Sequence, residues 1–122
     1  MELSDVITLN GELAQMNREK ELSFVIKYKL VKLLEQTTSI VKKFNQTKLE
    51  LFKKFGNEDP KIPGNFNLGD PKTNKNYEKG MDELKKLIEV EEEFNGFEFK
   101  LKDFAELKTS VSYVQFFKFL KE

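Results

Sequence analysis

The sequence predicts a single α+β domain that is mostly helical, and three patterns along its 122 residues support this fold class. An apolar pattern repeats with helical spacing between residues 23 and 55, shorter helical repeats flank it, and an Asn95-Gly96 pair marks a tight turn. We expect a long helical hairpin over residues 4–56 and a loop over residues 57–76. A third helix, a two-stranded antiparallel β-hairpin and a short C-terminal helix are expected within residues 77–122.

The strongest pattern is a run of residues whose spacing alternates between four and three, as the inner face of a helix requires. We call these residues the apolar stripe: Ile26, Leu30, Leu33, Thr37, Ile40, Phe44, Thr47 and Leu51. The pattern predicts one helix from Ser23 to Phe55, with Gly56 in the left-handed conformation that ends many helices. Such a helix is about 50 Å long at about 1.5 Å per residue, so the first helix can cover only part of the stripe.

The same spacing predicts three shorter helices, and turn-forming residues predict the segment between two of them. Ser4 is expected to cap the first helix, the third runs from Tyr77 to Leu87, and Ser110 is expected to cap the last. Their inner faces are expected to be Val6, Leu9, Leu13 and Met16; Tyr77, Met81, Leu84 and Ile88; and Val111, Val114, Phe117 and Leu120. Segment 57–76 contains all three prolines, which predicts a loop long enough to be functional or mobile.

A β-hairpin is predicted around Asn95-Gly96, because Asn-Gly is the preferred pair for a type I′ turn with positive φ at both residues. Folding there pairs Phe94 with Phe97, Val90 with Leu101, Glu91 with Lys100 and Glu89 with Lys102. Apolar and opposite-charge pairs of this kind stabilise antiparallel strands. One residue, Glu92, fits the register badly because it falls on the apolar face.

The composition excludes several classes of function. With no Cys and no His, the chain lacks thiol nucleophiles, thiolate metal sites and His-based acid–base pairs. Its 21 Lys and Arg balance its 21 Asp and Glu, without the positive surplus of a generic nucleic-acid binder. It has no signal-peptide pattern and no apolar run of about 20 residues, so we expect a cytoplasmic protein without a membrane partner. We therefore expect no enzyme activity, no metal and no cofactor.

Three motifs that resemble ligand sites are better explained as structural features. On a strand, the acidic run from Glu89 to Glu93 would place lysines opposite two of its carboxylates, whereas hard-cation sites use converging oxygens. Gly69 to Lys72 lacks the glycine pattern of a phosphate loop and predicts a turn. No pair of carboxylates lies in an aromatic-rich loop of the kind that forms a sugar cleft.

The basic stretch of the long helix leaves two interpretations open. Its lysines are Lys42, Lys43, Lys48, Lys53 and Lys54. In the first interpretation they form the solvent-exposed face of the helix, which is the ordinary role of such residues. Alternatively, together with aromatics of the loop region such as Phe66 and Tyr77, they would bind a nucleic acid or a nucleotide through its phosphates and bases.

The order of elements and several segments resemble a family of uncharacterised small proteins from tailed bacteriophages. Members have a short first helix and a long charged second helix that ends in a segment like Leu49 to Gly56. A variable loop follows, then an acidic strand like Glu89 to Glu93 and a strand-to-turn segment like Phe99 to Phe104, which leads into a short aromatic helix. The resemblance covers nearly the whole chain and implies a phage origin. It implies no catalytic residues.

Two arrangements of the apolar stripe remain open at the level of sequence. It packs entirely within the monomer, or it extends beyond the core and pairs with another chain; Thr37 and Thr47 weaken a long continuous dimer. Our leading hypothesis is a phage-encoded, non-enzymatic module that binds a host, defence or virion-assembly protein, or itself as a homo-oligomer. The expected interaction residues are Ile40, Phe44, Leu51, Phe52 and Phe55.

Overall fold

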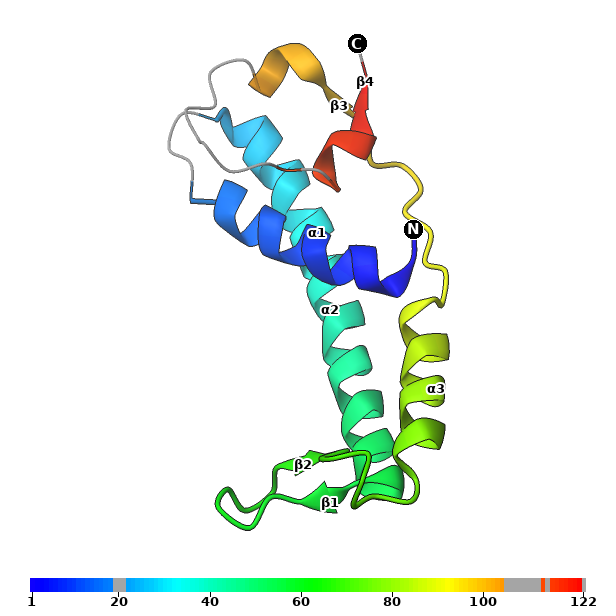
Figure 1. The fold of residues 1–122 in the computed structure, drawn as a ribbon. Coiled ribbons are helices and arrows are strands. Elements are labelled where there is room, and N and C mark those ends of the chain that lie inside the picture. The colour runs from blue at the N-terminus through cyan, green and yellow to red at the C-terminus, as the bar shows by residue number, and fades with distance from the viewer. Residues whose placement is uncertain (19–21, 105–112, 114, 122) are drawn as a thin grey trace. The chain divides into compact units, whose positions relative to one another are not determined.

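The computed structural model describes residues 1–18, 22–104, 113 and 115–121 and has the predicted α+β, mostly helical fold. Its described residues form the α-helices α1 (Leu3–Met16), α2 (Phe24–Phe55) and α3 (Tyr77–Ile88) (Figure 1). They also form the short strands β1 (Asn57–Glu58), β2 (Phe66–Asn67), β3 (Phe99–Lys100) and β4 (Leu120–Lys121), and the 3-10 helices η1 (Leu101–Phe104) and η2 (Phe116–Phe119). The chain divides into two compact units: unit 1 contains residues 1–41 and 91–122, and unit 2 contains residues 42–90.

The long helix is continuous, as the stripe predicts. Different interactions determine where it begins and where it ends. The Ser23 hydroxyl accepts a hydrogen bond from the Ile26 amide (3.3 Å), as a side-chain N-cap does. At the other end the prediction for Gly56 is wrong, because Gly56 does not have positive φ. A Cβ at Gly56 would instead collide with the carbonyl oxygen of Asn67, so glycine is required there by the close approach of β2.

The first helix begins two residues earlier than a helix capped by Ser4 would. Its N-terminal flanking residue is Glu2, which makes no side-chain capping hydrogen bond, and Ser4 lies inside the helix. Its inner face is the predicted one, and Val6, Leu9, Leu13 and Met16 are all completely buried. The helical period of the apolar residues was therefore a better guide to this helix than the presumed capping residue.

The core of unit 1 combines α1, the N-terminal half of α2 and an aromatic cluster. Its buried members are Leu9, Leu13, Met16, Leu22, Ile26, Leu30, Leu33, Phe99, Phe104, Tyr113 and Phe116. The ring of Phe116 lies 5.1 Å from that of Phe99 and 5.2 Å from that of Phe104, in the tilted and edge-to-face arrangements that aromatic pairs prefer. These rings hold β3, η1 and η2 together within the core.

Two polar side chains complete this core, and each is satisfied. Thr37 is completely buried, and its hydroxyl accepts a hydrogen bond from the Asn10 side-chain amide (3.0 Å) and donates to the carbonyl of Leu34. The Glu12 carboxylate is also buried and accepts hydrogen bonds from the amides of Gln115 and Phe116 at the start of η2. Buried polar groups paired in this way fix the register of the elements that carry them.

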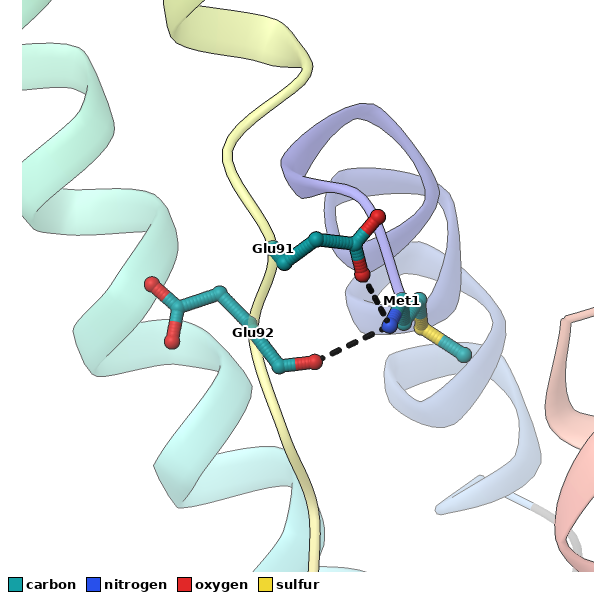
Figure 2. Close-up of polar contacts among 3 residues, drawn as sticks. All are labelled: Met1, Glu91 and Glu92. Atoms are coloured by element: carbon teal, nitrogen blue, oxygen red, sulfur yellow. Dashed lines mark hydrogen bonds and ion pairs between the residues drawn. The ribbon is translucent and has the colours of Figure 1, made fainter.

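The predicted β-hairpin around Asn95-Gly96 does not form. Gly96 has positive φ and a turn is present, but Asn95 does not have positive φ, so the turn is not the type I′ that would align the flanking strands. Segment 91–92 pairs instead with the N-terminus, where Glu91 forms an antiparallel bridge with Glu2. Figure 2 shows the Met1 amine between the Glu91 carboxylate (2.9 Å) and the Glu92 carbonyl (3.0 Å).

The partner of β3 is the C-terminal strand β4, and the two strands are parallel. The predicted last helix is replaced in its described part by the 3-10 helix η2, which leads directly into β4. The beginning of that predicted helix, residues 110–112 and 114, lies outside the described residues. Buried Phe99 packs against the ring of Phe116, not against the other strand of the predicted hairpin. The structure around Phe99 therefore depends on contacts between residues distant in sequence.

In unit 2 the antiparallel strand pair lies in the segment that was predicted to be a loop. β1 and β2 pair Asn57 with Asn67 and Glu58 with Phe66. The Asn74 side-chain amide donates to the carbonyls of Phe55 (2.8 Å) and Leu68 (2.9 Å), which joins the end of α2 to the segment after β2. Segment 57–76 is therefore an ordered cap on this end of the unit.

Helix α3 forms where the sequence predicts it and packs closely against this cap. Gly80 is buried, and a Cβ placed there would lie 2.6 Å from Leu68 Cδ2 and 3.0 Å from Phe55 Cβ. Gly80 is thus a packing residue, because only a residue without a side chain fits against Leu68 and Phe55. On the exposed side, a hydrogen bond and charge attraction from Asp82, with a smaller contribution from Glu83, raise the pKa of Lys86.

Two helical glycines provide a matched test of this packing. Gly11→Ala is expected to raise the free energy of unfolding by about 1 kcal/mol, because alanine favours the helix and nothing lies within 4 Å of the new methyl group. Gly80→Ala is expected to lower it by about 1–3 kcal/mol, since Leu68 and Phe55 leave no room. Urea denaturation followed by circular dichroism measures both. Equal stabilisation by the two variants would show that Leu68 does not pack on Gly80.

Candidate functional site

The five predicted interaction residues lie on α2, and none of them is freely exposed. Phe44 is buried, with an exposed fraction of 8%, and Ile40, Leu51, Phe52 and Phe55 are half-buried. The Lys48 ammonium lies 5.5 Å from the centre of the Phe44 ring, and the Cβ of Phe55 faces Gly80 of α3. The C-terminal half of α2 therefore already uses much of its apolar surface within unit 2, and the role of these residues in binding stays a prediction.

The freely exposed apolar surface of α2 lies at its other end. Phe24, Val25 and Tyr28 have exposed fractions of 90%, 65% and 67%. Residues three and four positions apart are neighbours on a helix surface, so Val25 and Phe24 both adjoin Tyr28 and the three side chains form one patch, which we call the α2 patch. It lies beside the stripe residues Ile26 and Leu30, whose side chains are buried in the core of unit 1.

Beside the α2 patch lies an open groove of about 870 Å³. One wall is the first turns of α2, which contribute Val25, Ile26 and Tyr28. The other wall is the segment from Gly96 to Lys100, followed by Lys102. Val25 and Tyr28 belong to both features, so the α2 patch and this groove, which we call the α2–β3 groove, form one continuous surface within unit 1.

The α2–β3 groove has an uneven charge. Four of its lining residues are the lysines Lys29, Lys32, Lys100 and Lys102, and its one acidic lining residue is Glu98. The Lys32 ammonium lies 5.7 Å from the centre of the Tyr28 ring, at the distance of a cation–π contact. Within the described parts of the chain, none of these four lysines forms an ion pair. The surface thus combines exposed aromatic rings with positive charge.

Sequence reasoning missed this surface because it looked for binding residues at the C-terminal end of the stripe. Phe24, Val25 and Tyr28 lie at the other end of the helix and are not among the predicted interaction residues. One available signal was the number of apolar residues in the first turns of the helix. Positions 24, 25 and 28 add a second face to the one formed by positions 26 and 30, and a single core can bury only one of them.

The lysine-rich face of α2 has a different character. The Lys53 ammonium lies 5.6 Å from the centre of the Phe66 ring, which brings a predicted loop aromatic to this face. The Lys54 ammonium similarly lies 5.3 Å from the ring of Phe55, while Tyr77 is half-buried at the start of α3. Lys53 and Lys54 therefore each lie at cation–π distance from an aromatic ring of unit 2.

The acidic motifs form no ion-binding geometry in the described part of the chain. No group of three or more acidic side chains converges there in a way that could hold a metal ion. Glu91 is paired with the Met1 amine, while Glu89 and Glu93 are exposed. Asp70 accepts a hydrogen bond from the Lys72 amide (2.8 Å), which confirms the predicted turn.

Comparison with known proteins adds no relative to this description. No protein-family model, curated protein sequence or solved structure matches the chain. Among the described residues, no helix is both long and apolar enough to cross a membrane. The geometry of the surface is therefore the basis for any functional proposal.

Two phenylalanines of α2 separate a packing role from a surface role. Phe44→Ala is expected to lower the free energy of unfolding by about 3–5 kcal/mol, because the ring is buried. Phe24→Ala is expected to change it by less than about 0.5 kcal/mol, because this ring is 90% exposed. The measurement is urea denaturation followed by circular dichroism, with the same residue change on the same helix. A large loss at Phe24 would mean that its ring packs within the chain.

Proposed function

We propose that this chain is a non-enzymatic protein-interaction module that binds a partner protein through the first turns of α2. The observation that carries the proposal is the α2 patch, in which Phe24, Val25 and Tyr28 are exposed side by side on one helix. Single exposed apolar residues are common on protein surfaces, whereas contiguous patches mark interaction sites. The family resemblance adds a phage origin, the host cytoplasm as location, and host, defence or virion-assembly proteins as partner classes.

The patch has the chemistry and the rigidity that a binding anchor needs. Aromatic residues are enriched among the residues that dominate binding energy, because they bury a large area with few rotatable bonds. The helix below them is fixed to unit 1 by Ile26 and Leu30, whose side chains are in the core. Binding would therefore order few groups beyond the exposed rings, which keeps the entropic cost of association low.

Capture experiments with matched surface variants test the proposal. The double variant Phe24→Ser and Tyr28→Ser is expected to lose the partner that the wild-type chain captures from a lysate of its bacterial host. The control is Ile62→Ser, which removes a 56% exposed apolar side chain from unit 2 and is expected to leave capture intact. Quantitative mass spectrometry of the eluates measures the difference, with a C-terminal tag that leaves the Met1 amine free. Equal capture by the double variant would contradict the proposal.

Self-association is a special case of the same proposal, with a second copy of the chain as the partner. Analytical ultracentrifugation of the wild type and of the Phe24→Ser, Tyr28→Ser variant distinguishes it from binding to another protein. A dimer that dissociates in the variant would assign the patch to self-association.

A second candidate function is nucleic-acid or nucleotide binding by the lysine-rich face of α2. The observation that favours it is the position of Lys53 over the ring of Phe66, since stacked rings and cations together bind single strands. Three phosphate contacts would make affinity for a labelled oligonucleotide fall roughly 20-fold between about 50 and 200 mM salt. Fluorescence anisotropy measures this dependence, and Lys53→Ala should reduce it. The protein-interaction proposal expects no such salt-dependent binding.

A further inference from the structure

We infer that the α2–β3 groove accepts an acidic, extended segment of the partner protein, with carboxylates that alternate with apolar side chains. The inference rests on the proposed function, since it assumes that the partner is a protein. It goes further by assigning the chemistry of the bound segment, which the α2 patch alone does not determine. Three features of the groove carry it: its charge, its apolar lining and the backbone of its second wall.

The charge of the groove selects an acidic occupant. Lys29 and Lys32 lie on its α2 wall, and Lys100 and Lys102 lie on the opposite side, so positive charge is present along both walls. Lys29, Lys32, Lys100 and Lys102 are exposed, and they face a single lining carboxylate, that of Glu98. A carboxylate placed between the walls is attracted from both sides, and a lysine-rich occupant is repelled.

Apolar groups in the lining explain why carboxylates alone would not fill the groove. Ile26 and Phe99 are almost fully buried in the core of unit 1 and also line the groove, so core side chains form part of its surface. Val25, Tyr28 and Phe97 add further apolar surface. In an extended chain, successive side chains point to opposite sides, so a segment of alternating glutamate and leucine presents one carboxylate face and one apolar face.

The backbone of the second wall favours an extended peptide. β4 pairs with β3 on one side, and residues 96–98, from the turn at Asn95-Gly96 up to β3, belong to no described strand. The backbone of a segment that leads into a short strand is where an added strand pairs when a peptide extends a sheet. An extended peptide presents backbone N–H and C=O groups at the spacing of a β-strand, so it can pair with this segment.

A single-stranded nucleic acid is a less suitable occupant, although it shares the negative charge. By sequence, unit 1 has more acidic than basic residues, so a long polyanion that left the groove would find no surplus of positive charge there. A short acidic peptide segment confines its charge to the groove and avoids this cost.

A designed peptide tests the inference on the full-length protein. The probe is a fluorescein-labelled heptapeptide with glutamate at alternate positions and leucine between them, and binding is measured by fluorescence anisotropy. The control peptide has glutamine in place of every glutamate. We expect the glutamate peptide to bind about tenfold more tightly, and its affinity to fall as salt is raised.

Charge-reversal variants locate the binding. Lys29→Glu and Lys100→Glu, one on each wall, are each expected to weaken the glutamate peptide about tenfold. Lys42→Glu is the matched control, because it makes the same change on an exposed lysine of α2 outside the groove, and it should leave affinity unchanged. All three lysines are exposed, and circular dichroism confirms that the variants are folded.

The possible results separate this inference from the proposed function. Equal binding of the two peptides, no loss in Lys29→Glu and Lys100→Glu, or no peptide binding at all would overturn the inference. Tighter binding of a thymidine oligonucleotide that competes with the peptide would also overturn it. If partner capture requires Phe24 and Tyr28 but is unchanged in Lys29→Glu and Lys100→Glu, the proposed function stands while the acidic segment is wrong. Capture that is unchanged by substitution of Phe24, Tyr28, Lys29 or Lys100 would contradict both the proposed function and the inference.

Discussion

The rest of the structure depends on the burial of one face of α2, because this helix contributes side chains to the cores of both units. In unit 1, Leu30, Leu33 and Thr37 are completely buried, and in unit 2 Phe44 is buried on the same stripe. Burying one such side chain contributes about 1.5–3 kcal/mol, so the stripe is a main source of stability. The buried contact between Thr37 and Asn10 then fixes how α1 lies on α2, because any slip would leave polar groups unpaired.

The helices could be predicted from sequence because their signals are local and periodic. α2 and α3 begin and end within about one residue of the predicted bounds, since an apolar face at helical spacing admits few alternatives. The β-structure could not be predicted, because its partners are distant in sequence. Glu91 pairs with Glu2 and Phe99 with Leu120, whereas the predicted hairpin used only neighbouring residues. The misfit of Glu92 was the one local sign that the predicted register was wrong.

The candidate site could be predicted only in part, for a related physical reason. Helical spacing shows which residues share a face, but it does not show how far along the helix a partner covers that face. The leading hypothesis placed the binding residues at and beside the C-terminal end of the stripe, where the structure places Phe55 against α3 and the cap formed by segment 57–76. Phe24 and Tyr28, which stay exposed, lie off the stripe, so no argument based on the stripe could reach them.

The position of the lysines beside the α2 patch also bears on which partner the surface admits. An exposed aromatic patch on its own would favour association with any apolar surface, including the same patch on a second copy. In a symmetric dimer whose two-fold axis passed close to Lys29 and Lys32, these lysines would lie near their equivalents, and like charges that approach closely oppose association. The same lysines attract a partner that carries carboxylates. In the proposed complex, the aromatic rings would supply much of the affinity, while the surrounding charge would favour an acidic partner.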